Sequence, residues 1–349
     1  MSNANLNKAK DAKNDEFYTQ LEDVSRELMH YKGHFKDKVV FCNCDDPTWS
    51  AFWKYFHLNF ELLGLKKLIS THYDREKLTY KMIYEGGNDN DVEAGEKIPL
   101  EGNGDFRNAE CVELLKEADV VVTNPPWSLF RDYLAQLLEY GKEFLIIGNK
   151  NAITYKETFP LLKDNLVWLG YNSPSEFNTP EGISKKVSGL GRWFTNLDIK
   201  KRHDKLYLYK KYSPEEFPRY DNYNAINVNK VADIPEDYCE SWEVTDEEFA
   251  KLPFGEWDIV RDAKHPEGVS HFVIPAQGTE LRKLLHEHRE GYREEIEKAL
   301  GDCLYDPGIM GVPITFMDKY NADQFELVGY LKGKVNGVTK YHRLIIKRK

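Results

Sequence analysis

Four runs of mainly apolar residues divide the first half of the chain. They lie at residues 38–44, 67–74, 118–123 and 143–149. These runs lack the strict alternation of apolar and polar positions that marks a half-exposed strand, and they are typical of strands buried on both faces of a sheet. Each run therefore predicts a buried strand.

The segments between these runs have helical spacing. Residues 17–32 place their apolar side chains on one face of a helix. A helix is also predicted from Pro47, with Asp46 as its N-cap, and two more over 111–116 and 128–140. Strands that alternate with helices predict an α/β fold with a mixed, mostly parallel sheet.

The alternation fades after about residue 155, where Pro, Asn and Gly become frequent. An amphipathic helix is predicted over 279–300, and a hairpin over 325–349 with Asn336–Gly337 as its turn. The Gly-, Asn- and Asp-rich segment 85–104 predicts a loop. Short strand-like pieces occur at 166–169, 192–197 and 205–210.

Composition narrows the class of protein. The 349 residues, 41% of them hydrophobic, are enough for a sizeable core in one large or two ordinary domains. No apolar run is long enough to span a membrane, and residues 1–16 lack the apolar centre of a signal peptide. The five cysteines are scattered, which favours reduced thiols and a cytoplasmic protein.

Charge is unevenly distributed along the chain. The net charge of −10 argues against a protein coated in phosphate-binding groups. However, residues 181–211 carry 9 basic and 3 acidic side chains, and residues 331–349 carry 7 basic and none acidic. Two basic blocks in an acidic chain are compatible with a polyanionic partner, and also with ordinary solvated surfaces.

The motif that carries chemistry is Asn124–Pro125–Pro126–Trp127, placed directly after a predicted buried strand. Ligands of open α/β sheets bind beyond the carboxyl ends of the strands. The nitrogen of an aromatic amino group is a poor nucleophile, because its lone pair is delocalised into the ring. The Asn124 side-chain oxygen and the Pro125 carbonyl can accept the hydrogens of such a nitrogen, and the two prolines fix both acceptors in place. Trp127 offers a face on which a flipped base can stack.

This motif resembles the (D/N)PP(Y/F/W) motif of amino-methyltransferases, and longer blocks resemble the EcoRI-type adenine-specific DNA methyltransferase family. The blocks are 39–47 (VVFCNCDDP), 124–155 (NPPWSLFRDYLAQLLEYGKEFLIIGNKNAITY), 193–197 (WFTNL), 220–231 (YDNYNAINVNKV) and 311–320 (GVPITFMDKY). The resemblance implies a Rossmann-like class I methyltransferase domain followed by a C-terminal target-recognition region. It also implies S-adenosylmethionine as the methyl donor and N6 of adenine in double-stranded DNA as the acceptor.

Roles follow for individual residues. Asn124, Pro125, Pro126 and Trp127 are the implied catalytic residues, with Trp127 stacking on the adenine. The resemblance implies that four segments bind the donor. Residues 17–19 contact its methionine part, and the loop after the first strand surrounds it. Asp74 accepts from its ribose hydroxyls, and residues 105–106 contact its adenine. The implied donor-binding residues are Phe17, Tyr18, Thr19, Asn43, Cys44, Asp45, Pro47, Asp74, Asp105 and Phe106.

The chain also departs from the expected pattern. The glycine-rich loop common in methyltransferases is absent, and Cys44–Asp45–Asp46–Pro47 stands in its place. Residues 255–305 match the family poorly and are a candidate insertion. The predicted organisation is a flexible leader at 1–16, a donor-binding catalytic domain at 17–210 and a target-recognition region at 211–349.

Partners and metals are predicted from the remaining features. A restriction endonuclease of the same specificity, acting without a stable complex, is a further candidate partner, and the sequence leaves its existence open. No metal site is predicted, because His286–Glu287–His288 lacks the spacing of a helical zinc site. Cys42 and Cys44 are predicted to be small buried side chains. The candidate phosphate contacts are Lys185, Lys186, Arg192, Lys200, Lys201 and Arg202.

Two other functions use the same motif or fold. A methyltransferase acting on RNA or on protein glutamine needs the same carbonyl acceptors. A DNA-binding module that has lost catalysis would keep the fold, although the intact motif argues against it. The recognised DNA sequence and the oligomeric state do not follow from the sequence.

Overall fold

The structure of the protein is a computed structural model, and it describes residues 18–74, 79–174, 176–178, 184–186, 189–245, 269–273 and 304–349. The chain divides into two compact units, Met1–His203 and Asp204–Lys349. This boundary lies seven residues before the predicted one at 210/211. The predicted leader, residues 1–16, lies outside the described residues.

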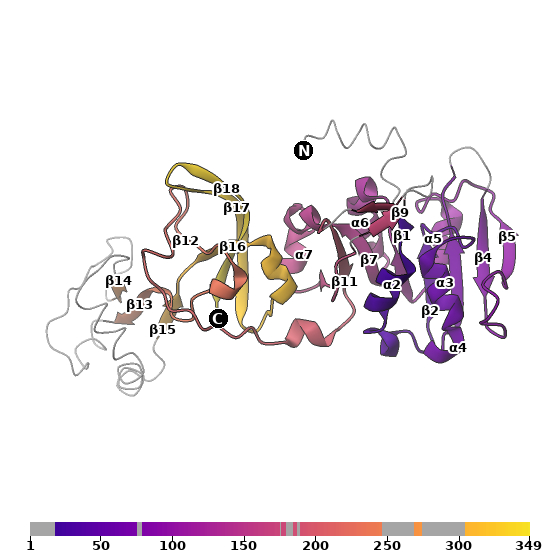
Figure 1. The fold of residues 1–349 in the computed structure, drawn as a ribbon, viewed down its shortest axis with the longest axis horizontal. Helices are drawn as coiled ribbons and strands as arrows, with labels where there is room; N and C mark the ends of the chain where they lie inside the picture. Colours follow the sequence, from indigo (N-terminus) through magenta and orange to yellow (C-terminus); the bar gives the residue numbers. More distant parts are fainter. Residues whose placement is uncertain are drawn as a thin grey trace. The chain divides into compact units, whose positions relative to one another are not determined.

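The first unit is built on an eight-stranded sheet (Figure 1). The four central strands are mutually parallel, and six of the eight strands run in one direction, because only β4 and β11 are antiparallel to the centre. The mixed, mostly parallel sheet is thus confirmed. In spatial order the strands are β5 (Glu96–Pro99), β4 (Tyr80–Tyr84), β3 (Lys67–Thr71), β2 (Val39–Asn43), β6 (Val120–Thr123), β7 (Glu143–Asn149), β11 (Gly191–Thr195) and β8 (Trp168–Leu169).

Helices cover both faces of this sheet (Figure 1). All five residues of β2 are buried, and its alternate side chains Val40 and Cys42 share a core with residues of α2 and α3. The opposite face packs against α5 and α6. Burial on both faces explains the continuous apolar runs in the sequence. The helices are α2 (Leu21–Leu28), α3 (Ala51–Leu58), α4 (Phe60–Leu63), α5 (Ala109–Glu117), α6 (Phe130–Glu139) and α7 (Phe159–Lys163), with 3-10 helices η1 (Lys32–His34), η2 (Trp127–Leu129), η3 (Lys150–Thr154) and η4 (Lys200–His203).

Three local predictions were wrong. The strand-like piece at 205–210 forms no strand and contributes only a single bridge between Lys210 and Pro235. The helix predicted from Pro47 begins at Ala51, where the Ser50 side chain accepts from the N–H groups of Phe52 and Trp53. Asp46 instead closes a turn by accepting from Thr48. The predicted loop 85–104 contains β5, which pairs with β4 and extends the sheet beyond β3.

A second, three-stranded sheet brings the start of the described chain to a distant segment. It consists of β1 (Tyr18–Thr19), β9 (Glu176–Asn178) and β10 (Ser184–Lys186), all antiparallel. Thr19 lies opposite Phe177, and so does Lys185 on the other side. The segment predicted to hold the donor's methionine part is therefore attached to β9.

A buried carboxylate ties α2 to the chain that leads into this small sheet. Glu27 is fully buried. It accepts hydrogen bonds from the hydroxyl of Tyr31 at 2.8 Å and from the N–H groups of Tyr171 and Asn172, both at 2.7 Å. These donors replace the water that the carboxylate gives up, so its burial is tolerated.

Replacing Glu27 should destabilise the first unit. Glu27→Leu leaves the N–H groups of Tyr171 and Asn172 without their acceptor, and we expect a loss of about 3 kcal/mol in the free energy of unfolding. Glu22→Leu is the matched control, because that side chain is exposed on the same helix. Urea unfolding monitored by circular dichroism checks this, and equal midpoints for the two variants would contradict it.

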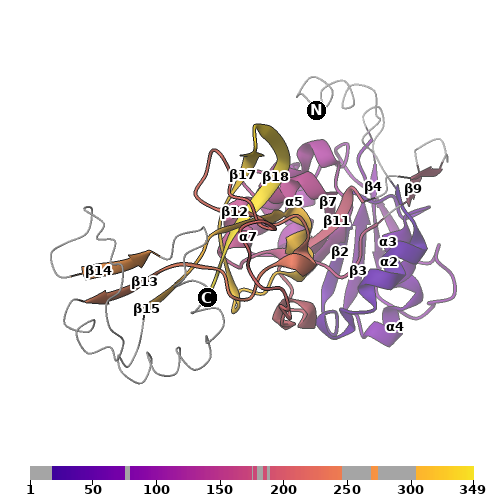
Figure 2. The ribbon, with the colours of Figure 1, turned by 60° about the vertical axis from the view of Figure 1, so that its left-hand side comes forward.

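The second unit contains two further sheets. A four-stranded sheet has the order β12 (Ile226–Asn227), β16 (Met310–Pro313), β18 (Val338–Arg348) and β17 (Phe325–Val335), and Figure 2 shows its long β17–β18 hairpin in yellow. The hairpin was predicted, and its turn is at Asn336–Gly337, both with positive φ angles. A three-stranded sheet has the order β14 (Val269–Val273), β13 (Cys239–Thr245) and β15 (Leu304–Pro307). The unit also contains the 3-10 helices η5 (Val231–Asp233) and η6 (Ile314–Lys319).

The remaining predictions for this unit are only partly covered. The helix predicted over 279–300 lies outside the described residues, as does most of the candidate insertion 255–305. The described parts of that segment, 269–273 and 304–305, pair with β13. Among the described residues, no helix has the length and apolar character required to cross a membrane.

Candidate active site

The Asn124–Trp127 motif lies where the sequence predicts it, directly after β6. This strand lies between β2 and β7, parallel to both, so the motif begins at the carboxyl edge of the sheet. The Pro126 carbonyl accepts from the N–H of Leu129 at 2.9 Å, which closes the turn leading into α6. The motif therefore has a rigid strand before it and a helix after it.

The side chains of Asn124 and Trp127 are joined to each other. The indole N–H of Trp127 donates to Asn124 Oδ1 at 3.3 Å. The Trp127 ring packs edge-on against Phe177 of β9, with 5.7 Å between ring centroids. An amide oxygen has two lone pairs, so a bond of this kind orients the oxygen without using its full capacity as an acceptor. Sequence reasoning gave Trp127 a stacking role and missed this contact.

Asp45 connects the loop after β2 to the motif. Its carboxylate accepts from the hydroxyls of Thr123 and Ser50, the latter at 3.1 Å, and from the backbone N–H of Asn124. Asp45 is buried, and this burial raises the pKa of its carboxyl from 3.8 to about 7, although the three hydrogen bonds oppose the shift. The carboxylate thus holds the end of β6, the first motif residue and the N-cap of α3 together.

The end of β2 offers a polar group that the protein itself does not use. Asn43 Oδ1 accepts from the Tyr133 hydroxyl at 3.0 Å and from the Cys44 thiol at 3.2 Å. Within the described residues, the buried Asn43 Nδ2 has no hydrogen-bond partner, and neither have Thr19 Oγ1 and His72 Nδ1. Asn43 and His72 lie at the carboxyl ends of adjacent strands, β2 and β3. Buried polar groups rarely stay unpaired, so this edge fits a polar ligand.

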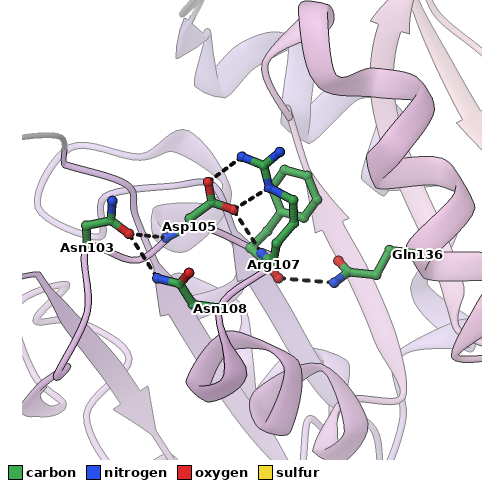
Figure 3. Close-up of polar contacts among 6 residues, drawn as sticks. Asn103, Asp105, Arg107, Asn108 and Gln136 are labelled. Atoms are coloured by element: carbon green, nitrogen blue, oxygen red, sulfur yellow. Dashed lines mark hydrogen bonds and ion pairs between the residues drawn. The ribbon is translucent and has the colours of Figure 1, made fainter.

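The loop predicted to contact the donor's adenine is internally bonded (Figure 3). Asp105 makes a two-pronged ion pair with Arg107, at 2.8 and 2.6 Å, and this pair lowers the pKa of the Asp105 carboxyl. Asn103 Oδ1 accepts from Asn108 Nδ2 and from the N–H of Asp105, and Gln136 of α6 donates to the Phe106 carbonyl. The carboxylate predicted to receive an amino group therefore already has a guanidinium partner.

Phe106 and Gly104 fix this loop against its neighbours. Phe106 is buried, with its ring edge-on to Tyr133 at 5.0 Å, so the ring is part of the packing. Gly104 has a φ angle of +72°, and a Cβ there would collide with the carbonyl oxygen of His72. The backbone N–H of Asp74 donates to the Asn103 carbonyl at 3.0 Å, which brings the predicted ribose-binding Asp74 to the same loop.

Sequence reasoning missed a polar cluster beside these residues. Asp46 accepts from the Tyr80 hydroxyl at 2.9 Å and lies 3.6 Å from His72 Nε2. Burial lowers the pKa of His72 and raises that of Tyr80. The two consecutive acids Asp45 and Asp46 were the sequence feature that could have indicated this cluster. Only the fold shows that the Asp45 carboxylate is buried and that of Asp46 is partly exposed.

The other predicted donor-site residues lie around this edge or outside the description. Pro47 is buried in the turn after β2. Tyr18 belongs to β1, and Phe17 is outside the described residues. Cys42 is buried as predicted, whereas Cys44 is only partly buried. Burial raises the pKa of both thiols, so neither is an activated nucleophile. Among the described residues there is no His, Cys, Asp and Glu cluster suited to a metal, and 286–288 lie outside them.

The predicted phosphate contacts fall into two groups. Lys185 and Lys186 lie in β10, whose neighbour β9 carries the Phe177 that contacts Trp127. The residues of η4, 200–203, follow β11, which runs antiparallel to β7. The last residue of β11, Thr195, pairs with Leu145 near the start of β7, so the chain leaves β11 at the edge opposite the motif.

Several of these cations are already engaged. Arg192 is buried and donates to the Gly191 carbonyl, which departs from the predicted solvent-facing phosphate contact. Lys201 donates to the Gly170 carbonyl. The Arg202 guanidinium stacks 3.5 Å from the ring centroid of Trp168 and pairs with Asp198. Lys200 is exposed.

The sequence profile described as "Adenine-specific methyltransferase EcoRI" matches residues 5–298 and 296–349. The chain belongs to this family. It is 39% identical to Type II methyltransferase M.EcoRI of Escherichia coli over 385 aligned residues, which cover 100% of this chain and 97% of that protein. No solved structure matches.

Two mycoplasma proteins extend the comparison with this EcoRI family. Type II methyltransferase M.MpnI of Mycoplasma pneumoniae is 39% identical over 67% of this chain and 77% of its own length. Type II methyltransferase M.MgeORF184P of Mycoplasma genitalium is 30% identical over 98% of both chains. The family resemblance and the α/β fold expected from the sequence are confirmed. The edge around Asn124 is therefore the candidate active site of an adenine-specific methyltransferase, which requires a methyl donor.

Proposed function

We propose that this member of the EcoRI family is a site-specific DNA methyltransferase that transfers the methyl group of S-adenosylmethionine to N6 of a flipped adenine. The observation that carries the proposal is the fixed Asn124 amide at the carboxyl edge of β6. Asp45 holds its backbone, and Trp127 orients its side-chain oxygen. Such prealigned acceptors suit an amino group whose hydrogens must be held during reaction.

The residues of the motif divide the chemistry between them. Asn124 Oδ1 and the Pro125 carbonyl accept the two hydrogens of N6, which draws electron density toward the nitrogen and favours its tetrahedral geometry. Transfer is direct, so no enzyme nucleophile is needed, in agreement with the raised thiol pKa values of Cys42 and Cys44. The N–CH3 bond would form as the S–CH3 bond of the donor breaks, and the sulfur would leave as a neutral thioether. The methylated nitrogen would then release its extra proton to solvent, because an aromatic ammonium is strongly acidic.

The donor supplies an electrophilic methyl on a sulfonium, and the carboxyl edges of β2 and β3 fit the rest of its polar groups. Asn43 Nδ2 and Thr19 Oγ1 are buried and need partners that the described protein residues do not provide. Amide and hydroxyl groups of this kind suit the amino-acid portion of S-adenosylmethionine. Asp74 remains the proposed ribose acceptor and Asp105 the proposed adenine contact. When the donor binds, the Arg107 side chain either shares the Asp105 carboxylate with the donor's adenine or moves away from Asp105.

The substrate base must leave the duplex to reach these acceptors. Trp127 then offers a ring face for the base, while Phe177 packs at right angles to the Trp127 ring. Lys185 and Lys186 are proposed phosphate contacts near this position. The enzyme acts in the cytoplasm on double-stranded DNA, and a restriction endonuclease of the same specificity is its proposed partner, acting without a stable complex.

The test is a transfer assay with methyl-labelled S-adenosylmethionine and unmethylated DNA of mixed sequence, followed by digestion to nucleosides. We expect label in N6-methyldeoxyadenosine, and mapping of the modified positions in undigested DNA should give one recurring sequence. Parallel reactions contain RNA or cell protein. Label found only in RNA or in protein glutamine would replace the DNA proposal, and DNA binding without any transfer would indicate a catalytically inactive module.

A further inference from the structure

The β17–β18 hairpin extends well beyond the sheet to which it belongs. Strand β16 pairs with β18 only from Arg343 to Ile346. Past that point β17 and β18 pair only with each other, as far as Lys334 opposite Thr339 and Val335 opposite Val338. Within the described residues, the distal part, residues 332–342, is therefore a two-stranded ribbon, and Figure 2 shows its curved closed end.

This distal ribbon is strongly basic. It carries Lys332, Lys334 and Lys340, and it has no acidic residue. Lys332 and Lys334 are exposed, and within the described residues no carboxylate pairs with either ammonium group or with that of Lys340. Tyr341 is 89% exposed and lies between Lys340 and His342. Within the described residues, these ammonium groups thus have no carboxylate partner, and an exposed aromatic ring lies next to one of them in sequence.

A neighbouring segment holds the ribbon in shape. Tyr220 packs against Gly333, where a Cβ would collide with its ring. Asn222 accepts from the N–H of Lys334 at 2.8 Å. Asp221 accepts from the N–H groups of Asn336 and Gly337, so its carboxylate is engaged in fixing the turn. The segment from Tyr220 to Asn222 thus supports the ribbon, while Lys332, Lys334 and Tyr341 are exposed.

We propose that this distal ribbon binds double-stranded DNA, with Lys332, Lys334 and Lys340 contacting phosphates and Tyr341 contacting the groove. The inference rests on the proposed function and adds to it a surface outside the catalytic unit. A major groove about 12 Å wide admits a two-stranded ribbon. Three ammonium groups without a carboxylate partner among the described residues, on a short and supported ribbon, favour a polyanionic partner over a neutral one.

The charge part of the proposal is tested by the salt dependence of DNA binding by the full chain. For K332Q/K334Q/K340Q, we expect the slope of log affinity against log salt concentration to fall by about 2.7, or about 0.9 per lost contact. The matched control K36Q/K66Q/K116Q removes three exposed lysines that precede β2, β3 and β6, at the edge opposite the motif. Its slope should stay within about 1 of the wild-type value.

The single variants K332Q and K340Q repeat the measurement with little risk to folding, each with an expected decrease of about 0.9. Tyr341→Ala should weaken duplex binding about tenfold at one salt concentration without changing the slope, because it removes no charge. An unchanged slope in the triple variant, with a folded far-ultraviolet spectrum, overturns the proposal. A larger effect on RNA than on duplex DNA would assign the surface to RNA instead.

This test is separable from that of the proposed function. DNA binding is scored whether or not methyl transfer occurs, and donor binding by the triple variant should equal that of the wild type. A wild-type protein that binds DNA through the ribbon but transfers no methyl group would contradict the proposed function and leave this inference standing. A triple variant that methylates DNA and binds it with an unaltered salt slope would contradict this inference and leave the proposed function standing.

Discussion

Asn124→Ala should lower the rate of methyl transfer by a factor of about 10²–10³, because the variant lacks the side-chain oxygen that accepts from the reacting amino group. Removing a single prealigned hydrogen-bonding group from a transition-state site typically has an effect of this size. Donor affinity should change little, since Asn43 and Thr19, the proposed donor contacts, are untouched. The single-turnover rate with saturating labelled donor and DNA measures the effect.

Asn124→Asp is the matched control for this substitution. It keeps an acceptor oxygen of the same reach, and Asp occupies this position in the (D/N)PP form of the motif. We expect it to retain far more activity than Asn124→Ala. Near-normal turnover of Asn124→Ala would show that the side-chain oxygen does not hold the amino group, and equal losses in both variants would point to backbone disturbance.

Trp127→Phe separates two roles of the tryptophan. It keeps an aromatic face for the base but loses the indole N–H that donates to Asn124 Oδ1 at 3.3 Å. We expect a roughly tenfold lower rate constant for Trp127→Phe with little change in DNA affinity, and a loss of both for Trp127→Ala. Equal kinetics of Trp127→Phe and wild type would remove the orienting role from the indole.

The central sheet was predictable because its strands are buried on both faces. The runs at 38–44, 118–123 and 143–149 contain β2, β6 and β7, since a doubly covered strand must be apolar at every position. Strands β4 and β5 extend the sheet from β3 and are partly exposed, so the Gly- and Asn-rich sequence around β5 gave only a loop signal. The hairpin turn at Asn336–Gly337 was predictable from local sequence, because a turn of this type depends on those two residues alone.

The site was predictable as far as a motif or a strand end marks it. Asn124 follows a recognisable strand, and the sequence therefore located it. The partners that orient it, Asp45 and Trp127, depend on contacts across the sheet, and Asp45 is 78 residues from the Thr123 that it holds. No local pattern distinguishes an aspartate that binds a ligand from one that joins two strands. For the same reason, the basic residues of η4 could not be placed relative to the motif before the direction of β11 was known.

Asp45 is the residue whose removal should test this arrangement most sharply. Its carboxylate accepts from Ser50, Thr123 and the N–H of Asn124, so Asp45→Ala leaves all three donors without their acceptor. A displacement of Asn124 by about 1 Å is enough to reduce the rate by about 10². Because Asp45 acts through Asn124, the double variant with Asn124→Ala should be little slower than Asn124→Ala alone. Additive losses in this cycle, measured as single-turnover rates, would show that Asp45 acts independently of the motif.

Asp45→Asn tests the same carboxylate through its titration. Burial raises the pKa from 3.8 to about 7, so the folded chain binds this proton more tightly than the unfolded chain. The resulting stabilisation is complete below about pH 4 and is lost as the pH rises through 7, with a span on the order of 4 kcal/mol. The amide introduced by Asp45→Asn does not titrate, so the wild type should lose stability relative to this variant across the same window. Parallel stability curves from urea unfolding at pH 5, 6, 7 and 8 would mean that the carboxyl titrates at its ordinary pKa, and that a charged Asp45 holds Asn124 throughout.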